Sequence, residues 1–434
     1  MRNHTVPFAE TLSDEKRRSC RNTAIVSTLL GCISSQVVEN GALILLFLTM
    51  LGGSESFSMF SSSLMSLSAI LLLIPCALFA AKCGIRITYS ISCIAGFLGF
   101  CLIAAAPYFG VWGKYGVIFG CAIYTLTLNF YASTWYPLLD NFLKAEERTP
   151  FFGRMRFIYM LFNAGLLFVL GKCSGSHMTV WAFQAVFLLA GLGLLGRKIC
   201  MDRLPLDPAM QRESADLRKT LPICLHNSPL MGFSLYLCCF YMAFSAALPL
   251  SMIYMKKSLG IAAGTIVILS AVNLLGKLAG FFLLGKYGKH FSMAKQIIFT
   301  HILALLAVSA LVFLSGKGAC TLLFLAGTAF FFTGMVAALL MCISAVGILE
   351  LAVKGNKLMA TAVCFTLINI GTAAGTLLTT FLLKDGVLKN TREFAGMIFS
   401  KYQFLSAIFA AGLLLCLLLL PFVPFVSEMR KKKS

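Results

Sequence analysis

The chain has 434 residues, of which 59% are hydrophobic and only 12% are charged. Because soluble domains carry about 25% charged residues, this composition excludes most soluble folds, secreted disulfide scaffolds and disordered chains and predicts a membrane protein. The formal net charge of +20 would indicate nucleic-acid binding only if Lys and Arg gathered on one water-facing surface. Their placement follows membrane topology instead, so we expect no nucleic-acid partner.

The cysteine and histidine patterns argue against a metal centre and against an enzyme. The 16 Cys lie mostly inside apolar runs without a C-x-x-C motif, and the five His are scattered. A membrane enzyme usually places paired carboxylates, a Cys/His dyad or a metal cluster near an interface, and the sequence suggests no such group. We therefore expect no metal, no cofactor and no catalytic residue.

Twelve transmembrane helices follow a polar N-terminal segment. Residues 1–21 are too charged for a cleavable signal, so we expect them to form a cytoplasmic tail. A helix of about 20 apolar residues crosses ~30 Å of hydrocarbon, and the runs here are too long and continuous for barrel strands. The predicted spans cover residues 22–51, 57–81, 87–108, 115–138, 155–171, 179–197, 229–254, 260–284, 294–315, 318–349, 358–383 and 401–426.

The distribution of Lys and Arg predicts the orientation of these spans. The two tails and the loops on the same side carry 26 of the 36 basic residues, whereas the loops on the opposite side carry 9. Basic residues are enriched on the cytoplasmic side of membrane proteins. We therefore expect both termini in the cytoplasm and a multi-pass protein of the cell membrane.

The longest hydrophilic stretch, residues 197–228, falls between spans six and seven and predicts two halves. These are an N-terminal bundle over 22–196 and a C-terminal bundle over 229–426, followed by a basic cytoplasmic tail at 427–434. An internal repeat supports the division, because AKCGIR at 81–86 after span two is echoed 204 residues later by GKYGKH at 285–290 after span eight. A second pair of segments, RTPFFG at 148–153 after span four and KGNKLM at 354–359 after span ten, falls at corresponding places in the two halves.

This pattern resembles the major facilitator superfamily, whose members have two six-helix halves, a long central cytoplasmic loop and Gly/basic loops after helices two and eight. The resemblance covers nearly the whole chain. It implies an all-α polytopic membrane protein with twelve transmembrane helices in two pseudo-symmetric six-helix bundles. It also implies transport by alternating access, in which the two bundles rock about a site near the midplane.

The chain departs from the superfamily signature at the acidic position before each first basic residue, where it has Ala81 and Gly285. If ion pairs hold the cytoplasmic side closed, they must then involve other groups. The charged loop after span four is the candidate, and the alternative is that this loop is simply solvated. The fourth span also lacks the arginine of many proton-coupled relatives, and the fifth lacks the Gly-Pro signature of drug antiporters. The predicted cytoplasmic gate residues are Lys82, Arg86, Asp140, Arg148, Arg154, Arg156, Lys286 and Lys289.

Two ionisable residues stand inside predicted spans, where an unsolvated charge is costly and therefore suggests function. Glu39 lies about 25 Å along span one. Gln36 and Asn40 share its polar stripe, so we expect this face to line the cavity between the halves, where Glu39 binds substrate or carries protons. Lys277, with Asn273 one turn earlier, lies in span eight and either binds solute or reaches the cytoplasmic surface with its long side chain.

Further polar side chains fall near the middle of spans that the resemblance places around the cavity. Amides and aromatic rings together suit a hydroxylated or otherwise polar solute. The alternative is that each amide simply ties two helices together. The additional candidates for substrate binding are Asn129, Trp135, Asn163 and Asn369, and Tyr124 and Tyr131 share one stripe of span four with Trp135.

We expect a secondary transporter of a small polar organic solute, driven by a gradient because no nucleotide-binding motif is present. Proton coupling through Glu39 is the finer prediction, and the sequence does not choose between symport and antiport. The alternatives are a facilitative uniporter, a lipid flippase, or a non-transporting solute sensor on the same scaffold. The expected partners are the solute, protons and the lipid bilayer, with the protein acting as a monomer.

Overall fold

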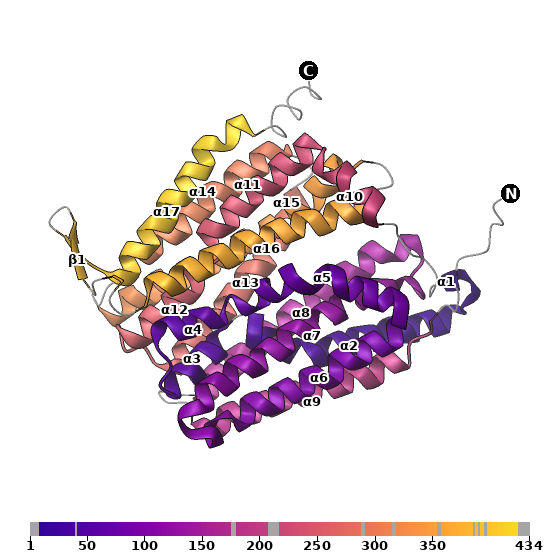
Figure 1. Cartoon of the computed structure of the whole chain (residues 1–434), viewed down its shortest axis with the longest axis horizontal. Coiled ribbons are helices and arrows are strands. Elements are labelled where there is room, and N and C mark those ends of the chain that lie inside the picture. The colour runs from indigo at the N-terminus through magenta and orange to yellow at the C-terminus, as the bar shows by residue number, and fades with distance from the viewer. Residues whose placement is uncertain are drawn as a thin grey trace. The chain divides into compact units, whose positions relative to one another are not determined.

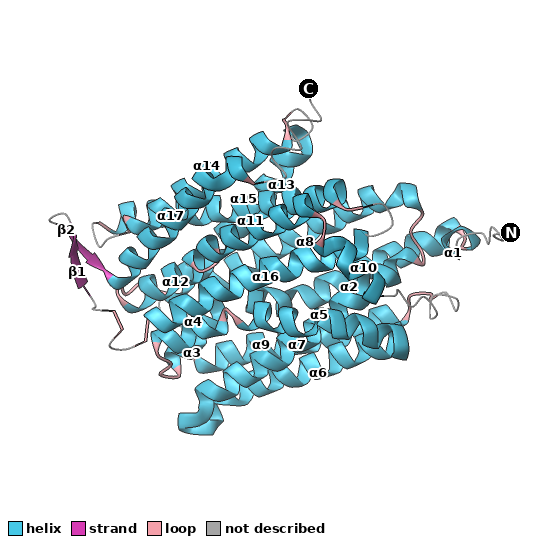
Figure 2. Cartoon of the chain, turned by 45° about the horizontal axis from the view of Figure 1, so that its top comes forward, coloured by secondary structure: helices cyan, strands magenta, loops and turns pink. Residues whose placement is uncertain are grey.

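The computed structural model describes residues 8–39, 41–174, 179–206, 217–287, 291–314, 318–353, 357–384, 387–388, 391–394 and 397–423. Most of them lie in helices (Figures 1 and 2). The α-helices are α1 (Phe8–Thr11), α2 (Asp14–Glu39), α3 (Ala42–Met50), α4 (Glu55–Ser61), α5 (Leu64–Cys83), α6 (Ile85–Ala105), α7 (Gly113–Asp140), α8 (Ala145–Ser174), α9 (Val180–Asp202), α10 (Leu217–Leu225), α11 (Ser228–Phe244), α12 (Ala247–Lys257), α13 (Ala263–Tyr287), α14 (Met293–Val312), α15 (Ala319–Leu351), α16 (Lys357–Leu382) and α17 (Lys401–Leu419). The 3-10 helices are η1 (Ala106–Trp112) and η4 (Leu420–Phe422), and the strands are β1 (Thr391–Phe394) and β2 (Met397–Ser400).

The predicted membrane spans are confirmed within the residues that the structure describes. Ten helical stretches are long and apolar enough to cross a membrane. One of them, Ile85–Trp135, has 51 residues and contains α6 and most of α7, which η1 joins through the non-helical Gly110. Counted as two spans, α6 and α7 raise the number to eleven, and the bent pair α2 and α3 supplies a twelfth, so within the described residues the fold is all-α with twelve transmembrane helices.

The first span is bent by 55° between α2, whose last described residue is Glu39, and α3, which begins at Ala42. Gly41 has a φ of +69°, in the left-handed region that favours glycine, and α3 begins at the next residue. The helix therefore cannot continue through this point. Glu39 therefore lies close to this bend, a feature that span prediction from hydropathy did not reveal.

The chain divides into two compact units that do not coincide with its sequence halves. Two segments of the N-terminal half, Gly41–Ile70 and Ala164–Met178, belong to the unit built mainly from the C-terminal half. The first unit comprises Met1–Asn40, Leu71–Asn163 and Thr179–Ala215, and the second comprises Gly41–Ile70, Ala164–Met178 and Asp216–Ser434.

In the first unit, α6 packs against α7 and α9, and α2 packs against α9. Small residues allow the closest contact: a Cβ atom on Gly193 of α9 would lie 2.2 Å from the carbonyl oxygen of Leu30 in α2. Between α6 and α7, the buried rings of Phe100 and Tyr124 have centroids 4.9 Å apart. This packing fixes the polar side chains of α2, α7 and α9 relative to one another.

In the second unit, α13 packs against α15 and α11 against α16, while α14 contacts both α15 and α17. Figure 1 shows α11, α14 and α17 side by side. The buried His301 of α14 joins these three helices, because its Nδ1 is 2.7 Å from the Tyr236 hydroxyl and its Nε2 is 3.1 Å from the Leu413 carbonyl oxygen. His301 therefore has a structural role.

A short β-hairpin precedes α17 and was not predicted. Strands β1 and β2 pair antiparallel with Thr391 opposite Ser400, as the magenta arrows in Figure 2 show. The Ser400 hydroxyl accepts a hydrogen bond from the Gln403 backbone N–H, and the Gln403 side chain caps Ser400 in return. The hairpin thus leads directly into a firmly capped helix start.

Candidate functional site

The polar stripe predicted on span one is divided between a buried and an exposed position. Gln36 is 3% exposed, and its Nε2 donates a hydrogen bond of 3.1 Å to the Tyr159 hydroxyl of α8. The Ser35 hydroxyl lies 3.2 Å from the same oxygen. Glu39 is exposed at the end of α2, and Asn40 lies outside the described residues. The structure therefore adds Tyr159, which the sequence analysis did not select, to this polar group.

A buried arginine lies among α2, α7 and α9. The Arg197 Nε donates a 3.3 Å hydrogen bond to the carbonyl oxygen of Ser27, and its guanidinium carbon lies 4.2 Å from the centre of the Tyr131 ring. Tyr131 in turn stacks on Trp135 with centroids 5.4 Å apart. The guanidinium fills the space beside Gly31, where a Cβ atom would lie only 1.7 Å from it. The predicted aromatic stripe of α7 therefore has a cation on its face.

Burial of the Arg197 guanidinium costs free energy because it removes a charged group from water. Its exposed fraction is 4%, and no ion pair is recorded for it among the described residues. A buried charge without a carboxylate partner costs several kcal/mol, which is only partly offset by the aromatic face and the carbonyl oxygen. Such a residue in a membrane protein points to function.

Sequence reasoning missed Arg197 because it counted this residue with the cytoplasmic linker at 197–228. Helix α9 instead continues to Asp202 and carries Arg197 inside the first unit. The available signal was the run GLGLLG at 191–196 immediately before it, since small residues predict close helix packing around the next side chain.

The amide candidates differ in how their hydrogen bonds are used. The amide nitrogens of Asn129 and Asn369 each donate to the carbonyl oxygen four residues earlier in their own helix. Asn273 instead donates to α15, to the Phe330 carbonyl oxygen at 2.9 Å and to the Thr333 hydroxyl at 3.2 Å. This geometry favours a tie between helices for Asn273, while its predicted role in binding stays a prediction.

The predicted roles of Asn163 and Lys277 in solute binding stay predictions. Asn163 of α8 is fully buried, yet neither its amide nitrogen nor its oxygen has a hydrogen-bond partner. A buried amide without partners usually contacts water or a ligand. Lys277 is half-buried on α13, one turn after Asn273.

The predicted gate residues lie partly outside the described structure. Among those described, Lys82, Arg86, Arg154 and Lys286 are exposed and Arg156 is half-buried. The side chains of Asp140 and Arg148, and the whole of Lys289, fall outside the described residues. Their assignment as a gate stays a prediction.

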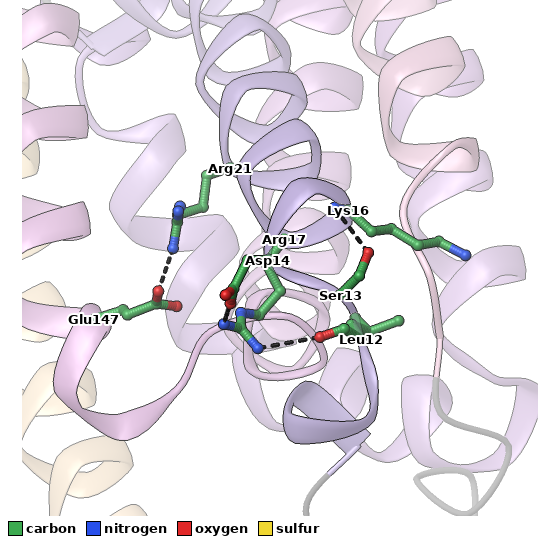
Figure 3. Close-up of polar contacts among 7 residues, drawn as sticks. All are labelled: Leu12, Ser13, Asp14, Lys16, Arg17, Arg21 and Glu147. Carbon is green, nitrogen blue, oxygen red and sulfur yellow. Dashed lines mark hydrogen bonds and ion pairs between the residues drawn. The ribbon is translucent and has the colours of Figure 1, made fainter.

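A charge contact in the first unit joins α2 to the charged region after span four. Arg21 pairs with Glu147 at the start of α8, and Arg17 pairs with Asp14 and donates to the Leu12 carbonyl oxygen (Figure 3). Burial raises the pKa of the Glu147 carboxyl, but the hydrogen bond and charge of Arg21 outweigh it, so the pKa lies below its ordinary value. Sequence analysis pointed to the charged loop after span four, but it did not identify Arg21 as a partner for this loop.

Arg21 and Glu147 also line a hollow of about 470 Å³. Arg18 and Arg154 bring further positive charge to its wall. The start of α8 is therefore surrounded by cations from α2 and from α8 itself.

A family model described as the Major Facilitator Superfamily matches residues 24–376. The chain belongs to the major facilitator superfamily. No curated protein matches the sequence. A match over most of the chain, together with the twelve-helix fold, makes the protein a multi-pass membrane transporter of a solute and not an enzyme.

Solved structures of other transporters share the superfamily fold. The nucleoside transporter NupG is 13% identical with a TM-score of 0.66, and the comparison covers 92% of this chain and 97% of that chain. The inward open xylose transporter XylE from E. coli is 12% identical with a TM-score of 0.68, covering 94% and 96%. A POT family transporter in complex with a thioalcohol-conjugated peptide is 12% identical with a TM-score of 0.67, covering 93% and 97%. At these identities the likeness shows the fold alone.

Proposed function

We propose that this superfamily member is a gradient-driven transporter of a small polar organic solute that carries negative charge, working by alternating access. The observation that carries the proposal is the buried Arg197 on the face of Tyr131, with no carboxylate paired to it in the described structure. A guanidinium has five N–H donors in a fixed fork that suits carboxylate or phosphate groups. An anionic solute would supply the missing counter-charge.

Other side chains of the first unit support recognition of a polar solute. Tyr131 and Trp135 provide stacked aromatic faces, and Gln36 and Tyr159 provide amide and hydroxyl groups that are already hydrogen-bonded to each other. Groups held by such contacts lose little conformational entropy when a ligand binds. The neighbours named above are a nucleoside transporter, a xylose transporter and a POT family transporter in complex with a thioalcohol-conjugated peptide, so the fold itself does not choose among solutes.

We propose that Glu39 carries the coupling proton. It is an exposed carboxyl group beside the bend between α2 and α3, close to the left-handed Gly41. A carboxyl at a helix break can exchange a proton with water on whichever side the break faces. A proton moving down 100 mV supplies about 2.3 kcal/mol, enough to concentrate a solute more than tenfold. Facilitated uniport is the outcome if uptake does not respond to a proton gradient.

The proposed setting is the cell membrane with both termini in the cytoplasm. It rests on the excess of Lys and Arg in the tails and in the loops on their side. Reaction of a single introduced cysteine in the N-terminal segment with an impermeant reagent tests it. Labelling only after the cells are opened is the expected result, and labelling of intact cells contradicts it.

A thermal-shift screen of the purified full-length protein tests the proposed function. Carboxylates, amino acids, nucleotides, sugars and nucleosides are compared, because a ligand of the native state stabilises it by about 2.7 kcal/mol at a hundred times its Kd. We expect stabilisation by an anionic class and uptake of that solute into proteoliposomes. Stabilisation without uptake would indicate a sensor, and stabilisation only by lipids would indicate a flippase.

Paired variants connect the screen to the site. Gln36→Ala removes the donor to Tyr159, whereas Gln184→Ala removes a comparable hydrogen bond from Gln184 to the Ala104 carbonyl oxygen elsewhere in the first unit. We expect the ligand-induced shift to fall in Gln36→Ala and to persist in Gln184→Ala. Equal shifts in the two variants would remove Gln36 and Tyr159 from the site.

A further inference from the structure

A groove of about 450 Å³ lies on the second unit among α13, α14 and α15. Its walls are mostly apolar, and two rim residues, Phe291 and Phe299, are about half exposed. The groove is lined by Leu283, Leu284, Phe291, Lys295, Gln296, Phe299, Thr300 and Leu339.

Lys295 is the group that gives this groove its charge. The Gln296 amide nitrogen donates to the Phe291 carbonyl oxygen at 3.0 Å, and the Thr300 hydroxyl donates to the Gln296 carbonyl oxygen at 2.8 Å. These two polar side chains are thus occupied within their own segment. Lys295 is exposed, no carboxylate lines the groove, and no ion pair is recorded for Lys295 among the described residues.

The groove runs along α14 from the start of this helix toward its middle. Lys295 is the third residue of α14, whose apolar span runs over Met293–Val312. Thr300 lies five residues later, or about 7.5 Å deeper at ~1.5 Å per residue. The ammonium group is therefore at the level where headgroups meet hydrocarbon, and the apolar walls lie at the level of acyl chains.

A second groove, on the first unit, has the same form but a different charge. It is lined by Arg86 and an apolar stripe of α6 that ends at Leu98, and it also contains Asp202. The Asp202 carboxylate accepts a hydrogen bond of 2.7 Å from Lys198 and another from the Tyr89 hydroxyl. Arg86 and Lys295 each lie in the first turn of the third membrane span of their sequence half, in α6 and α14. A carboxylate, that of Asp202, lines the groove of Arg86, whereas no carboxylate lines the groove of Lys295.

We infer that the α14 groove is a binding site for an anionic phospholipid, with the headgroup on Lys295 and one acyl chain between Leu284 and Phe299. A basic residue near a membrane surface contributes about 1 kcal/mol of attraction to an anionic lipid, which is about five-fold in affinity. The acyl chain contributes equally for charged and zwitterionic lipids. The site does not depend on the proposed solute, because no residue of the first unit takes part in it.

Native mass spectrometry of the full-length protein tests this inference by counting bound lipid in mixtures of phosphatidylglycerol and phosphatidylcholine with matched acyl chains. Wild-type protein should bind phosphatidylglycerol about five-fold more tightly at one site. Lys295→Gln should remove this preference while binding of phosphatidylcholine persists, and Lys295→Arg should retain it. Leu284→Trp, which fills the groove, should reduce binding of both lipids.

Arg86→Gln is the matched control, because it removes an exposed cation from the groove that contains Asp202. The preference for phosphatidylglycerol should survive in this variant. Equal binding of the two lipids to wild-type protein would overturn the inference. A preference unchanged in Lys295→Gln, or lost equally in Arg86→Gln, would also overturn it, because either result would reflect the net charge of the protein and not this groove.

Discussion

Lys401, the first residue of α17, forms an ion pair with Glu55, the first residue of α4. Both side chains are mostly shielded from solvent, with exposed fractions of 11% and 20%. Two hydrogen bonds lie nearby in sequence: the Ser56 hydroxyl donates to the Thr380 carbonyl oxygen at 2.7 Å, and the Lys257 ammonium donates to the Gly53 carbonyl oxygen at 2.9 Å. The segment that starts α4 is thereby attached to α12, α16 and α17.

Glu55→Gln should loosen this attachment. Loss of one partner leaves a partly buried ammonium without its counter-charge, at a cost of about 1–3 kcal/mol. We expect a lower Tm and faster hydrogen exchange in α4, with Glu350→Gln as the control because Glu350 is exposed on α15. The reversed pair, Glu55→Lys with Lys401→Glu, should recover part of the loss. Unchanged exchange in α4 of Glu55→Gln would contradict this role of the ion pair.

Glu39→Gln should separate coupling from binding. The variant keeps the size and polarity of the side chain but cannot release a proton, so uphill uptake driven by a proton gradient should disappear while counterflow continues. Uptake into proteoliposomes with and without an imposed pH gradient measures both. Glu10→Gln changes an exposed carboxyl of α1 and should behave as wild type. Full pH-driven accumulation in Glu39→Gln would exclude the coupling role.

Lys277→Met should distinguish a binding lysine from one that only reaches the membrane surface. If the half-buried ammonium on α13 contacts the solute, binding of an anionic solute should weaken about tenfold and that of a neutral analogue should change little. Titration calorimetry with both compounds measures the difference. Lys384→Met removes an exposed lysine after α16 and serves as the control. Equal changes for the two solutes would support a lysine that binds no solute.

The Arg21–Glu147 pair should make the first unit sensitive to acid. The pKa of Glu147 is lower in the folded protein than its ordinary value of 4.5, so the pair's contribution is fully present above pH 4.5. It is lost as the pH falls through the lowered folded value. Because both side chains are 28% exposed, we expect at most about 1 kcal/mol. Wild type should have a higher Tm than Glu147→Gln near neutral pH, and this difference should vanish in acid. A difference in Tm that does not change with pH would contradict a stabilising role for the Arg21–Glu147 ion pair.

The sequence predicted the twelve spans well because hydropathy reports the length of each apolar run directly. It placed Gln36 and Trp135 among candidate binding residues, and the structure buries both, Gln36 against the Tyr159 hydroxyl and Trp135 against the Tyr131 ring within a hydrophobic cluster. It did not predict that residues 41–70 pack with the second unit, because hydropathy contains no information about which helices meet. Arg197 was missed because a cation at the end of an apolar run is normally a loop residue, and only tertiary packing buries it here.

The ligand affinity of Arg197 variants tests the central claim most directly. The solute found in the screen is titrated against wild type, Arg197→Lys, Arg197→Gln and Arg203→Gln, the last of which removes an exposed arginine just beyond α9. All proteins are first matched for monodispersity and unfolding. We predict at least tenfold weaker binding for Arg197→Gln, an intermediate loss for Arg197→Lys and no loss for Arg203→Gln. Wild-type affinity in a folded Arg197→Gln protein would contradict the account.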